Sequence, residues 1–339
     1  MIRAAIKTIT SHLPDAELTN EQLAAEFEGV AAGSIYDKTG INVRRIAADG
    51  ECASDLGVAA AQKLFAVGVC SPAEIDFLLF CTQSPDYFLP TSACVMQDAL
   101  GLRTDCGAID INQGCSGYIY GLAVAKSLVE SGTARNVLFI TADTYSKFIN
   151  PRDRSLRTLF GDGATATYLG AVESDKELVG PFVFGSDGSG KAELILPAGG
   201  LRQPVDNEAR VETKDEQGNW RSACNLYMNG GAVFNFTMRI VPATIDQLLA
   251  KTGLSLDEID YFIPHQANKF MLERLRMKMK IPADKFFCDM EKTGNTVSSS
   301  IPIAFEMAKQ RGLVKMGDRV ALIGFGVGLS WGATLVEVQ

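Results

Sequence analysis

The chain has 339 residues, of which 47% are hydrophobic and 21% charged, so its composition excludes disorder as a description of the whole chain. Its 40 acidic and 32 basic residues leave a net charge of −8, which argues against a protein that coats nucleic acid. Only two histidines, His12 and His265, are present, and the eight cysteines show no CxxC spacing, so neither a metal site nor a disulfide scaffold is predicted.

The N-terminal segment lacks the features of a secretory signal. Arg3 and Lys7 interrupt its apolar residues, so no unbroken hydrophobic run forms. The longest uncharged stretch, residues 320–336, is short for a membrane span and contains four glycines. We read it as two buried strands joined by a glycine-rich turn. We therefore expect a cytoplasmic protein with no membrane partner and with reduced cysteines.

Short apolar runs alternate with amphipathic stretches along the whole chain. This pattern predicts an α/β fold with buried and largely parallel strands. The predicted helices are, in chain order, residues 54–66, 92–100, 116–131, 231–251, 269–279 and 297–311. The predicted strands are residues 77–81, 137–141, 165–169, 261–264, 320–324 and 333–338. The length indicates two domains, or one large core built from two halves.

Two segments of the chain resemble each other. Residues 71–81 and 255–265 both run from a serine through Glu-Ile-Asp into an apolar strand. Further along each copy, Cys115 and Asn295 take matching places just before a helix, and a strand follows that helix. Matched landmarks in the same order indicate a duplication.

We divide the chain on this basis into residues 1–172, which contain the candidate nucleophile, and residues 173–339. The second half includes a polar insertion near 199–224. A pseudo-twofold axis between the halves would bring equivalent strand ends to one shared cleft.

The best candidate nucleophile is Cys115. Residues 110–122 predict a strand, a sharp turn and a helix, with Cys115 at the turn. Gly114 and Gly117 remove side-chain bulk around it and permit unusual dihedrals. The layout resembles a nucleophile elbow with cysteine in place of serine, and the positive end of the helix dipole favours a thiolate. The alternative is a small apolar side chain packed at a strand–helix junction.

A histidine and an asparagine complete the candidate site. His265 ends a predicted strand directly after Pro264, so its side chain can project into a cleft, although a core histidine is the alternative. His12 is assigned no role. Asn295 precedes a helix. It either caps that helix or aims its side-chain amide at an anion. The glycine-rich segment 324–332 lacks the context of a dinucleotide site and fits an oxyanion-binding loop better.

Five motifs together resemble those of the 3-oxoacyl-acyl-carrier-protein synthase III family, in the thiolase superfamily. They are Gly114-Cys115-Ser116-Gly117, His265-Gln266-Ala267-Asn268, Gly294-Asn295-Thr296, Phe160-Gly161-Asp162-Gly163, and the late glycine loop with Trp331-Gly332. The resemblance extends from Ile2 to Val338. It implies a thiolase-like, five-layered αβαβα fold of two duplicated halves and a homodimer.

The resemblance also implies the chemistry. Cys115 would take the acyl group of an acyl-CoA primer. Malonyl-acyl carrier protein would then lose CO₂, with His265 Nε2 and the Asn295 amide stabilising the enolate oxygen. The carbanion would attack acyl-Cys115 and give a 3-oxoacyl-acyl carrier protein, while the backbone N–H groups of Cys115 and Val327 form the oxyanion hole. Acyl-CoA and acyl carrier protein are thus partners as substrates, and no cofactor or metal is implied.

Substrate-binding roles follow from the same resemblance. Lys38 and Arg154 match basic positions associated with the nucleotide of CoA, and Asn268 and Phe234 are expected to contact substrate. Leu89 stands where short-chain enzymes often have a phenylalanine that closes the acyl pocket across the dimer. We therefore expect a larger or differently shaped primer pocket than in an acetyl-specific enzyme.

The chain departs from the family pattern at three positions. Val327 replaces the middle residue of a three-glycine loop, and a β-branched residue restricts the backbone there. Ser34 stands where a tryptophan commonly stacks on the adenine of CoA, and Phe270 stands where many members have arginine. An acidic carrier protein needs a local basic patch, for which the candidates are Lys38, Arg154, Arg157 and Lys269.

Other functions stay open at this point. One is a non-decarboxylating acyltransferase of a specialised pathway, which would pass the acyl group to an amine or an alcohol. A cysteine hydrolase is more remote: the order Cys, His, Asn also describes papain-like proteases, but the repeat disfavours it. A catalytically silent scaffold would be expected to lack part of the triad. Segment 199–224 is expected to be a solvated surface loop, with a substrate-facing lid as the alternative.

Overall fold

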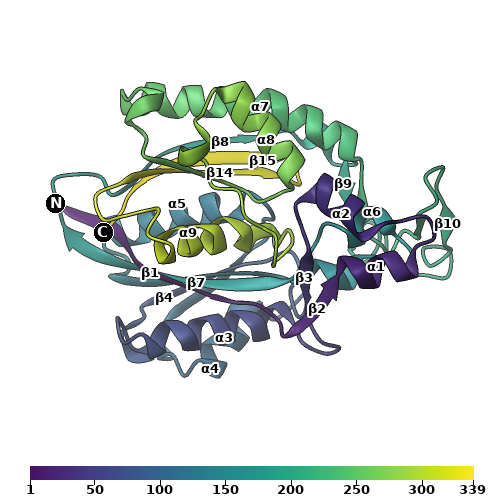
Figure 1. The fold of residues 1–339 in the computed structure, drawn as a ribbon. Coiled ribbons are helices and arrows are strands. Elements are labelled where there is room, and N and C mark those ends of the chain that lie inside the picture. Colours follow the sequence, from purple (N-terminus) through teal and green to yellow (C-terminus); the bar gives the residue numbers. More distant parts are fainter.

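In the computed structural model, which describes all 339 residues, two β-sheets alternate with three layers of helices (Figure 1). In Figure 1, α3 and α4 cover one outer face, α5 and α9 lie between the sheets, and α7 and α8 cover the other outer face. The αβαβα arrangement confirms the predicted fold class. These helices are α3 (Ala53–Ala66), α4 (Ser92–Ala99), α5 (Gly117–Glu130), α7 (Gly230–Thr252), α8 (Lys269–Met279) and α9 (Ser300–Gln310).

Both sheets are mixed. The five-stranded sheet has the order β1-β7-β6-β4-β5, in which β4 pairs parallel with β5 and β6, and β7 pairs antiparallel with β1 and β6. The four-stranded sheet has the order β13-β14-β15-β8, in which only the pair β13 and β14 is parallel. The strands are β1 (Ile2–His12), β4 (Phe77–Cys81), β5 (Gly107–Ile111), β6 (Asn136–Asp143), β7 (Gly163–Glu173), β8 (Val179–Ser186), β13 (Tyr261–Pro264), β14 (Arg319–Gly326) and β15 (Ser330–Glu337).

The prediction of a largely parallel sheet is therefore wrong. The pairs β6–β7 and β14–β15 are antiparallel although all four strands were predicted, because no long crossover helix separates the members of either pair. The edge strands β1 and β8, which add further antiparallel pairs, were not predicted. Edge strands face solvent on part of their surface and carry polar residues, so they lack the continuous apolar run that marked the central strands. Strand β5 has no fully buried residue.

Smaller elements surround one end of the layers (Figure 1). The predicted helix 297–311 begins with a 3₁₀ turn, Val297–Ser299, and continues as α9. The remaining elements are α1 (Asn20–Glu26), α2 (Ala32–Thr39), α6 (Arg154–Arg157), β2 (Ala16–Thr19), β3 (Val43–Ile46), β9 (Leu194–Ile195), β10 (Thr213–Lys214), β11 (Trp220–Arg221) and β12 (Tyr227–Met228).

The two similar segments fold alike. Ser71 and Ser255 each start a short 3₁₀ helix with the same capping box, whose glutamate accepts the serine N–H at 2.8 Å in both copies. Each turn leads into a strand that has a parallel neighbour, β6 beside β4 and β14 beside β13. Each sheet draws its strands from one side of the boundary between 172 and 173, to within one residue. The division into two domains stays a prediction.

Three apolar clusters fill the spaces between the layers. One packs α3 and α4 on the first sheet, one surrounds α5 and α9, and the largest, with 29 buried residues, lies under α7 and α8. Cys115 belongs to the largest cluster, so the candidate nucleophile lies inside the core rather than at the surface. None of the helices combines the length and the apolar character that crossing a membrane requires.

Candidate active site

Cys115 lies in a tight turn between β5 and α5 and is almost fully buried. Gly114 and Gly117 are required because a larger side chain would not fit at either position. A side chain at Gly114 would collide with Gln83 Oε1, and one at Gly117 would collide with the sulfur of Cys81. Neither glycine has a positive φ. The predicted need for unusual dihedrals at these glycines is therefore wrong, and close packing of the turn explains them.

The Cys115 thiol is protonated near neutral pH in the free enzyme. Burial raises its pKa to about 12, against the lowering effect of the N–H groups of Val327 and of Cys115 itself. The thiolate predicted from the helix dipole is thus not the resting form. The helix begins only at Gly117, and the loss of water around the sulfur has the larger effect.

The loop between β14 and β15 faces the sulfur. Gly326 and Gly328 have φ values of 157° and 135°, which glycine alone adopts without strain. A side chain at Gly326 would come within 2.7 Å of the Cys115 sulfur. Val327 between them has an ordinary φ, so the β-branched residue causes no conflict, and its N–H points to the sulfur.

His265 is held at the end of β13 on all sides. Its backbone N–H donates to Ile323 at 2.7 Å, and its ring meets Phe325 edge-on at 5.5 Å. Ring atom Nδ1 lies 2.7 Å from Ser300 Oγ. Burial lowers the pKa of the imidazole to about 3, so the ring is neutral at physiological pH.

Asn295 is placed by the Phe160-Gly161-Asp162-Gly163 motif. Its N–H donates to Leu159 at 2.9 Å, and its carbonyl accepts from Gly161 at 3.1 Å. Gly161 permits this approach, because a side chain there would collide with the carbonyl of Thr293. The side-chain Oδ1 accepts the N–H of Val297 at 3.0 Å, which leaves the Nδ2 donor for the cavity.

A buried carboxylate, Asp143, connects the segments around the nucleophile. It accepts the N–H of Gln83 at 2.8 Å and both the N–H and the hydroxyl of Ser298, at 3.1 and 2.5 Å. Burial raises its pKa to about 7. None of the sequence motifs includes Asp143. Its one signal in the sequence is an acidic residue at the end of a buried strand.

Cys115, His265 and Asn295 line one cavity of about 160 Å³. The remaining wall is mostly apolar. The chain therefore brings three residues from distant segments to one largely apolar space. A larger pocket of about 560 Å³ adjoins this cavity and opens to solvent. The residues shared by the two are Leu159, Gly230, Asn268 and Met271.

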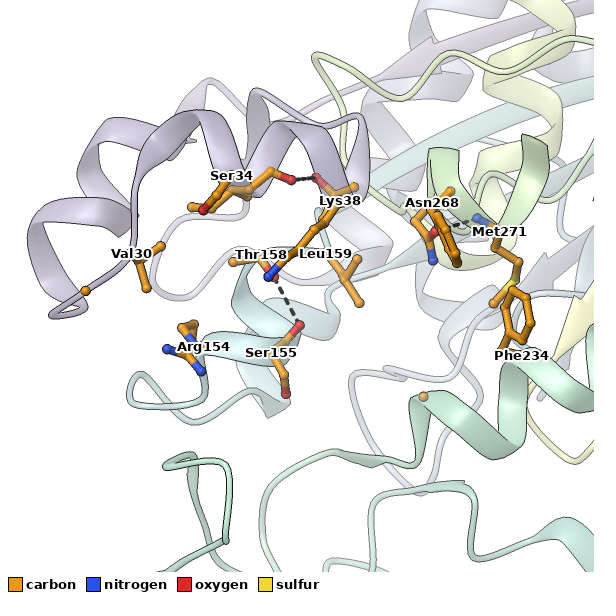
Figure 2. A pocket seen from close by; sticks show the side chains of 15 residues that line it. Val30, Ser34, Lys38, Arg154, Ser155, Thr158, Leu159, Phe234, Asn268 and Met271 are labelled. Carbon is orange, nitrogen blue, oxygen red and sulfur yellow. Dashed lines mark hydrogen bonds between the residues drawn. The ribbon is translucent and has the colours of Figure 1, made fainter. Parts of the chain in front are cut away.

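The outer pocket is cationic at one end. Figure 2 shows Lys38 of α2 and Arg154 of α6 at the same end, with Asn268, Met271 and Phe234 toward the other. Lys38 and Arg154 are the only charged residues that line it. Because neither forms an ion pair within the chain, both charges are available to an anionic ligand.

The other predicted substrate contacts lie at the junction and the mouth. Asn268 Oδ1 caps α8 by accepting the N–H of Met271 at 2.9 Å (Figure 2). Phe234 stacks on Phe270, with ring centroids 6.0 Å apart, so the mouth of the pocket is apolar there. Ser34 lines the outer pocket too.

Three predicted residues lie elsewhere. Leu89 is 83% exposed and lines neither cavity of this chain, so the expected primer pocket stays a prediction about a contact between chains. Arg157 forms an ion pair with Glu26 and lines a different pocket. The amine of Lys269 lies 5.4 Å above the ring of Tyr36. Only Lys38 and Arg154 of the proposed basic patch face the outer pocket.

The polar segment 199–224 is exposed over most of its length, and its last part is anchored to the protein. Its first part is exposed, but Arg221 forms ion pairs with Asp153 and, at 2.9 Å, with Asp215, so the hairpin of β10 and β11 is held against α6. Asp215 and Glu216 line a third pocket that shares Ser155, Leu159 and Gly230 with the outer pocket.

Comparison with known proteins points to one family. Models of the 3-oxoacyl-(acyl-carrier-protein) synthase III and of its C-terminal part match residues 109–188 and 249–338. The beta-ketoacyl-(acyl-carrier-protein) synthase III of Caldanaerobacter subterraneus subsp. tengcongensis is 38% identical over 99% of this chain and 98% of its own length.

Solved structures agree. A 3-oxoacyl-(acyl-carrier-protein) synthase III crystal structure at 2.1 Å is 52% identical, with a TM-score of 0.98 and 99% of both chains covered. A 3-oxoacyl-(acyl-carrier protein) synthase from Burkholderia xenovorans is 36% identical, with a TM-score of 0.90, over 100% of this chain and 95% of its own.

Proposed function

This chain belongs to the 3-oxoacyl-(acyl-carrier-protein) synthase III family, and from that membership and its site we propose a decarboxylative Claisen condensation of an acyl-CoA primer with malonyl-acyl carrier protein. The observation that carries the proposal is one largely apolar cavity that contains a thiol, a neutral imidazole and a free amide donor: Cys115, His265 and Asn295. The enzyme is an acyltransferase.

The first half-reaction transfers the acyl group to the protein. The Cys115 sulfur bonds to the thioester carbon, the bond from that carbon to the coenzyme A sulfur breaks, and the thiol proton ends on coenzyme A. The N–H groups of Cys115 and Val327, which already face the sulfur, stabilise the negative oxygen of the tetrahedral intermediate.

The second half-reaction forms the new carbon–carbon bond. The malonyl group loses CO₂ and leaves its electron pair as a thioester enolate. His265 Nε2–H and Asn295 Nδ2–H donate to the enolate oxygen, and each donor in such a largely apolar site contributes roughly 3 kcal/mol. The enolate carbon attacks acyl-Cys115, and the released thiolate takes a proton from solvent. This scheme uses side chains and substrates alone, and we propose that no cofactor takes part.

The test of the proposal is a mass measurement. Incubation with an acyl-CoA and malonyl-acyl carrier protein is expected to give a carrier-bound product that is two carbons longer than the primer, with one CO₂ released per turnover. Transfer of the unextended acyl group to an amine or an alcohol would instead support the non-decarboxylating alternative.

Lys38 and Arg154 are expected to bind the phosphates of coenzyme A. Replacing either with alanine removes one charge-assisted contact, so KM for the acyl-CoA rises about 10-fold while kcat changes little. Steady-state kinetics at two salt concentrations measures this, because the loss shrinks at high salt. Arg157→Ala is the matched control, since Arg157 is paired with Glu26 outside this pocket. An unchanged KM in both variants would place the nucleotide elsewhere.

We propose that the enzyme is a homodimer. Tyr87, Phe88 and Leu89 form an exposed apolar segment, with 60%, 80% and 83% of their surfaces accessible. The double change Phe88→Ser and Leu89→Ser is expected to shift the protein from dimer to monomer in sedimentation velocity at micromolar concentration. Exchange of exposed Leu201 for serine serves as the control, since it lies on the polar segment. A monomeric parent protein would contradict the proposal.

We also propose that the enzyme works in the cytoplasm. All eight cysteines are free, as a reducing compartment favours.

A further inference from the structure

His265 is fixed through a single ring nitrogen. Nδ1 lies 2.7 Å from the hydroxyl oxygen of Ser300, and the carbonyl of Val297 lies on the same side of the ring. Ser300 is the first residue of α9 and is buried. Nε2, on the other side of the ring, is left for the cavity that His265 shares with Cys115. The tautomer of a neutral imidazole is set by the bond that its other nitrogen makes.

The hydroxyl proton of Ser300 has two acceptors within reach, His265 Nδ1 and the carbonyl of Val297. Gln266 N–H donates to the oxygen at 3.3 Å, so one lone pair is already used. The carbonyl of Val297 lies 2.9 Å from the same oxygen, but it already accepts the backbone N–H of Ser300. The hydroxyl can therefore point to Nδ1 without leaving Val297 unpaired.

We propose that Ser300 is a positioning residue that selects the Nε2–H tautomer of His265 by donating its hydroxyl proton to Nδ1. This rests on the proposed function, because a neutral ring stabilises the enolate only when its proton is on Nε2. Without the hydroxyl, the group left near Nδ1 is the carbonyl of Val297, which can only accept. The ring proton would then move to Nδ1, and a lone pair on Nε2 would face the enolate oxygen.

The same short segment also orients the second donor. Val297 has a φ of 53°, a left-handed conformation that is unusual for a β-branched residue. In this conformation its N–H holds Asn295 Oδ1, while its carbonyl faces Ser300. Residues 295–300 thus direct both enolate donors into one cavity.

The test uses the fact that the chain has two histidines. The ¹⁵N spectrum of histidine-labelled protein contains two ring systems, and His12→Gln assigns them. In the parent protein we expect His265 to carry its proton on Nε2. In Ser300→Ala we expect the proton on Nδ1, malonyl decarboxylation about 10- to 100-fold slower, and Cys115 acylation little changed. Ser300→Thr keeps the hydroxyl and should restore both the tautomer and the rate.

Ser299→Ala separates positioning from packing. Ser299 is as buried, but its hydroxyl donates to the carbonyls of Thr141 and Gly163 and does not touch His265. It should lose stability without a change of tautomer. A proton on Nδ1 of His265 in the parent protein would overturn the inference. An unchanged tautomer and an unchanged decarboxylation rate in Ser300→Ala would overturn it too. The spectrum needs no substrate, so a failure of condensation in the parent protein would refute the proposed function separately.

Discussion

Cys115→Ala is expected to abolish acyl-enzyme formation and to slow condensation by roughly 10⁴-fold or more, while part of the malonyl decarboxylation survives. The reason is that the two half-reactions use different groups of one cavity: the sulfur accepts the primer, whereas His265 and Asn295 stabilise the enolate. Intact-mass measurement after exposure to a panel of acyl-CoAs reads the first effect, and CO₂ release reads the second.

Cys94→Ala is the matched control for this experiment. Cys94 is exposed, so it would report non-specific acylation of an accessible thiol, and its loss should leave the acyl adduct in place. An adduct of unchanged yield on Cys115→Ala would remove Cys115 from the mechanism. A folded Cys115→Ala protein that releases no CO₂ would count against the enolate role of the other two residues.

The protonation states separate this site from that of a cysteine protease. A papain-like enzyme works with a thiolate and an imidazolium, which requires a low cysteine pKa. Here burial acts in the opposite direction on both groups, raising the pKa of Cys115 to about 12 and lowering that of His265 to about 3. The free enzyme therefore holds a neutral thiol and a neutral imidazole instead of the ion pair, and the hydrolase alternative is not favoured.

The sequence predicts the centre of the fold better than its edges. Strands β4 and β14 lie where their apolar runs place them, because both faces of a central strand are buried. The edge strands β1 and β8 were missed, since an edge strand needs no continuous apolar run. The antiparallel pairs β6–β7 and β14–β15 join strands that were predicted, so strand positions alone did not give the direction of pairing.

For the site, motifs and packing carry different information. The motifs around Cys115, His265 and Asn295 suffice to name these residues, and the chain brings the three together in one cavity. Ser300 and Asp143 could not be found in this way, because their roles depend on contacts between segments far apart in the sequence. The direction of the Cys115 pKa shift depends on burial, which local sequence does not report.

Asn295→Asp is expected to slow malonyl decarboxylation by about 10²- to 10³-fold and to leave acylation of Cys115 much less affected. The change keeps the size of the side chain, and one carboxylate oxygen can still accept the N–H of Val297. The other oxygen replaces the Nδ2 donor and places negative charge against the enolate oxygen as its own charge develops. Separate assays of CO₂ release and of acyl adduct on one preparation measure the two effects.

Asn268→Asp supplies the comparison, because it adds the same charge at the border of the same cavity. Its Oδ1 caps α8 through the N–H of Met271, and a carboxylate preserves that cap. If the enolate oxygen lies between His265 and Asn295, the charge at 268 should cost far less decarboxylation than the charge at 295. Equal losses in the two variants would mean that general repulsion of the malonyl carboxylate dominates, and the assignment of Asn295 as an enolate donor would fail.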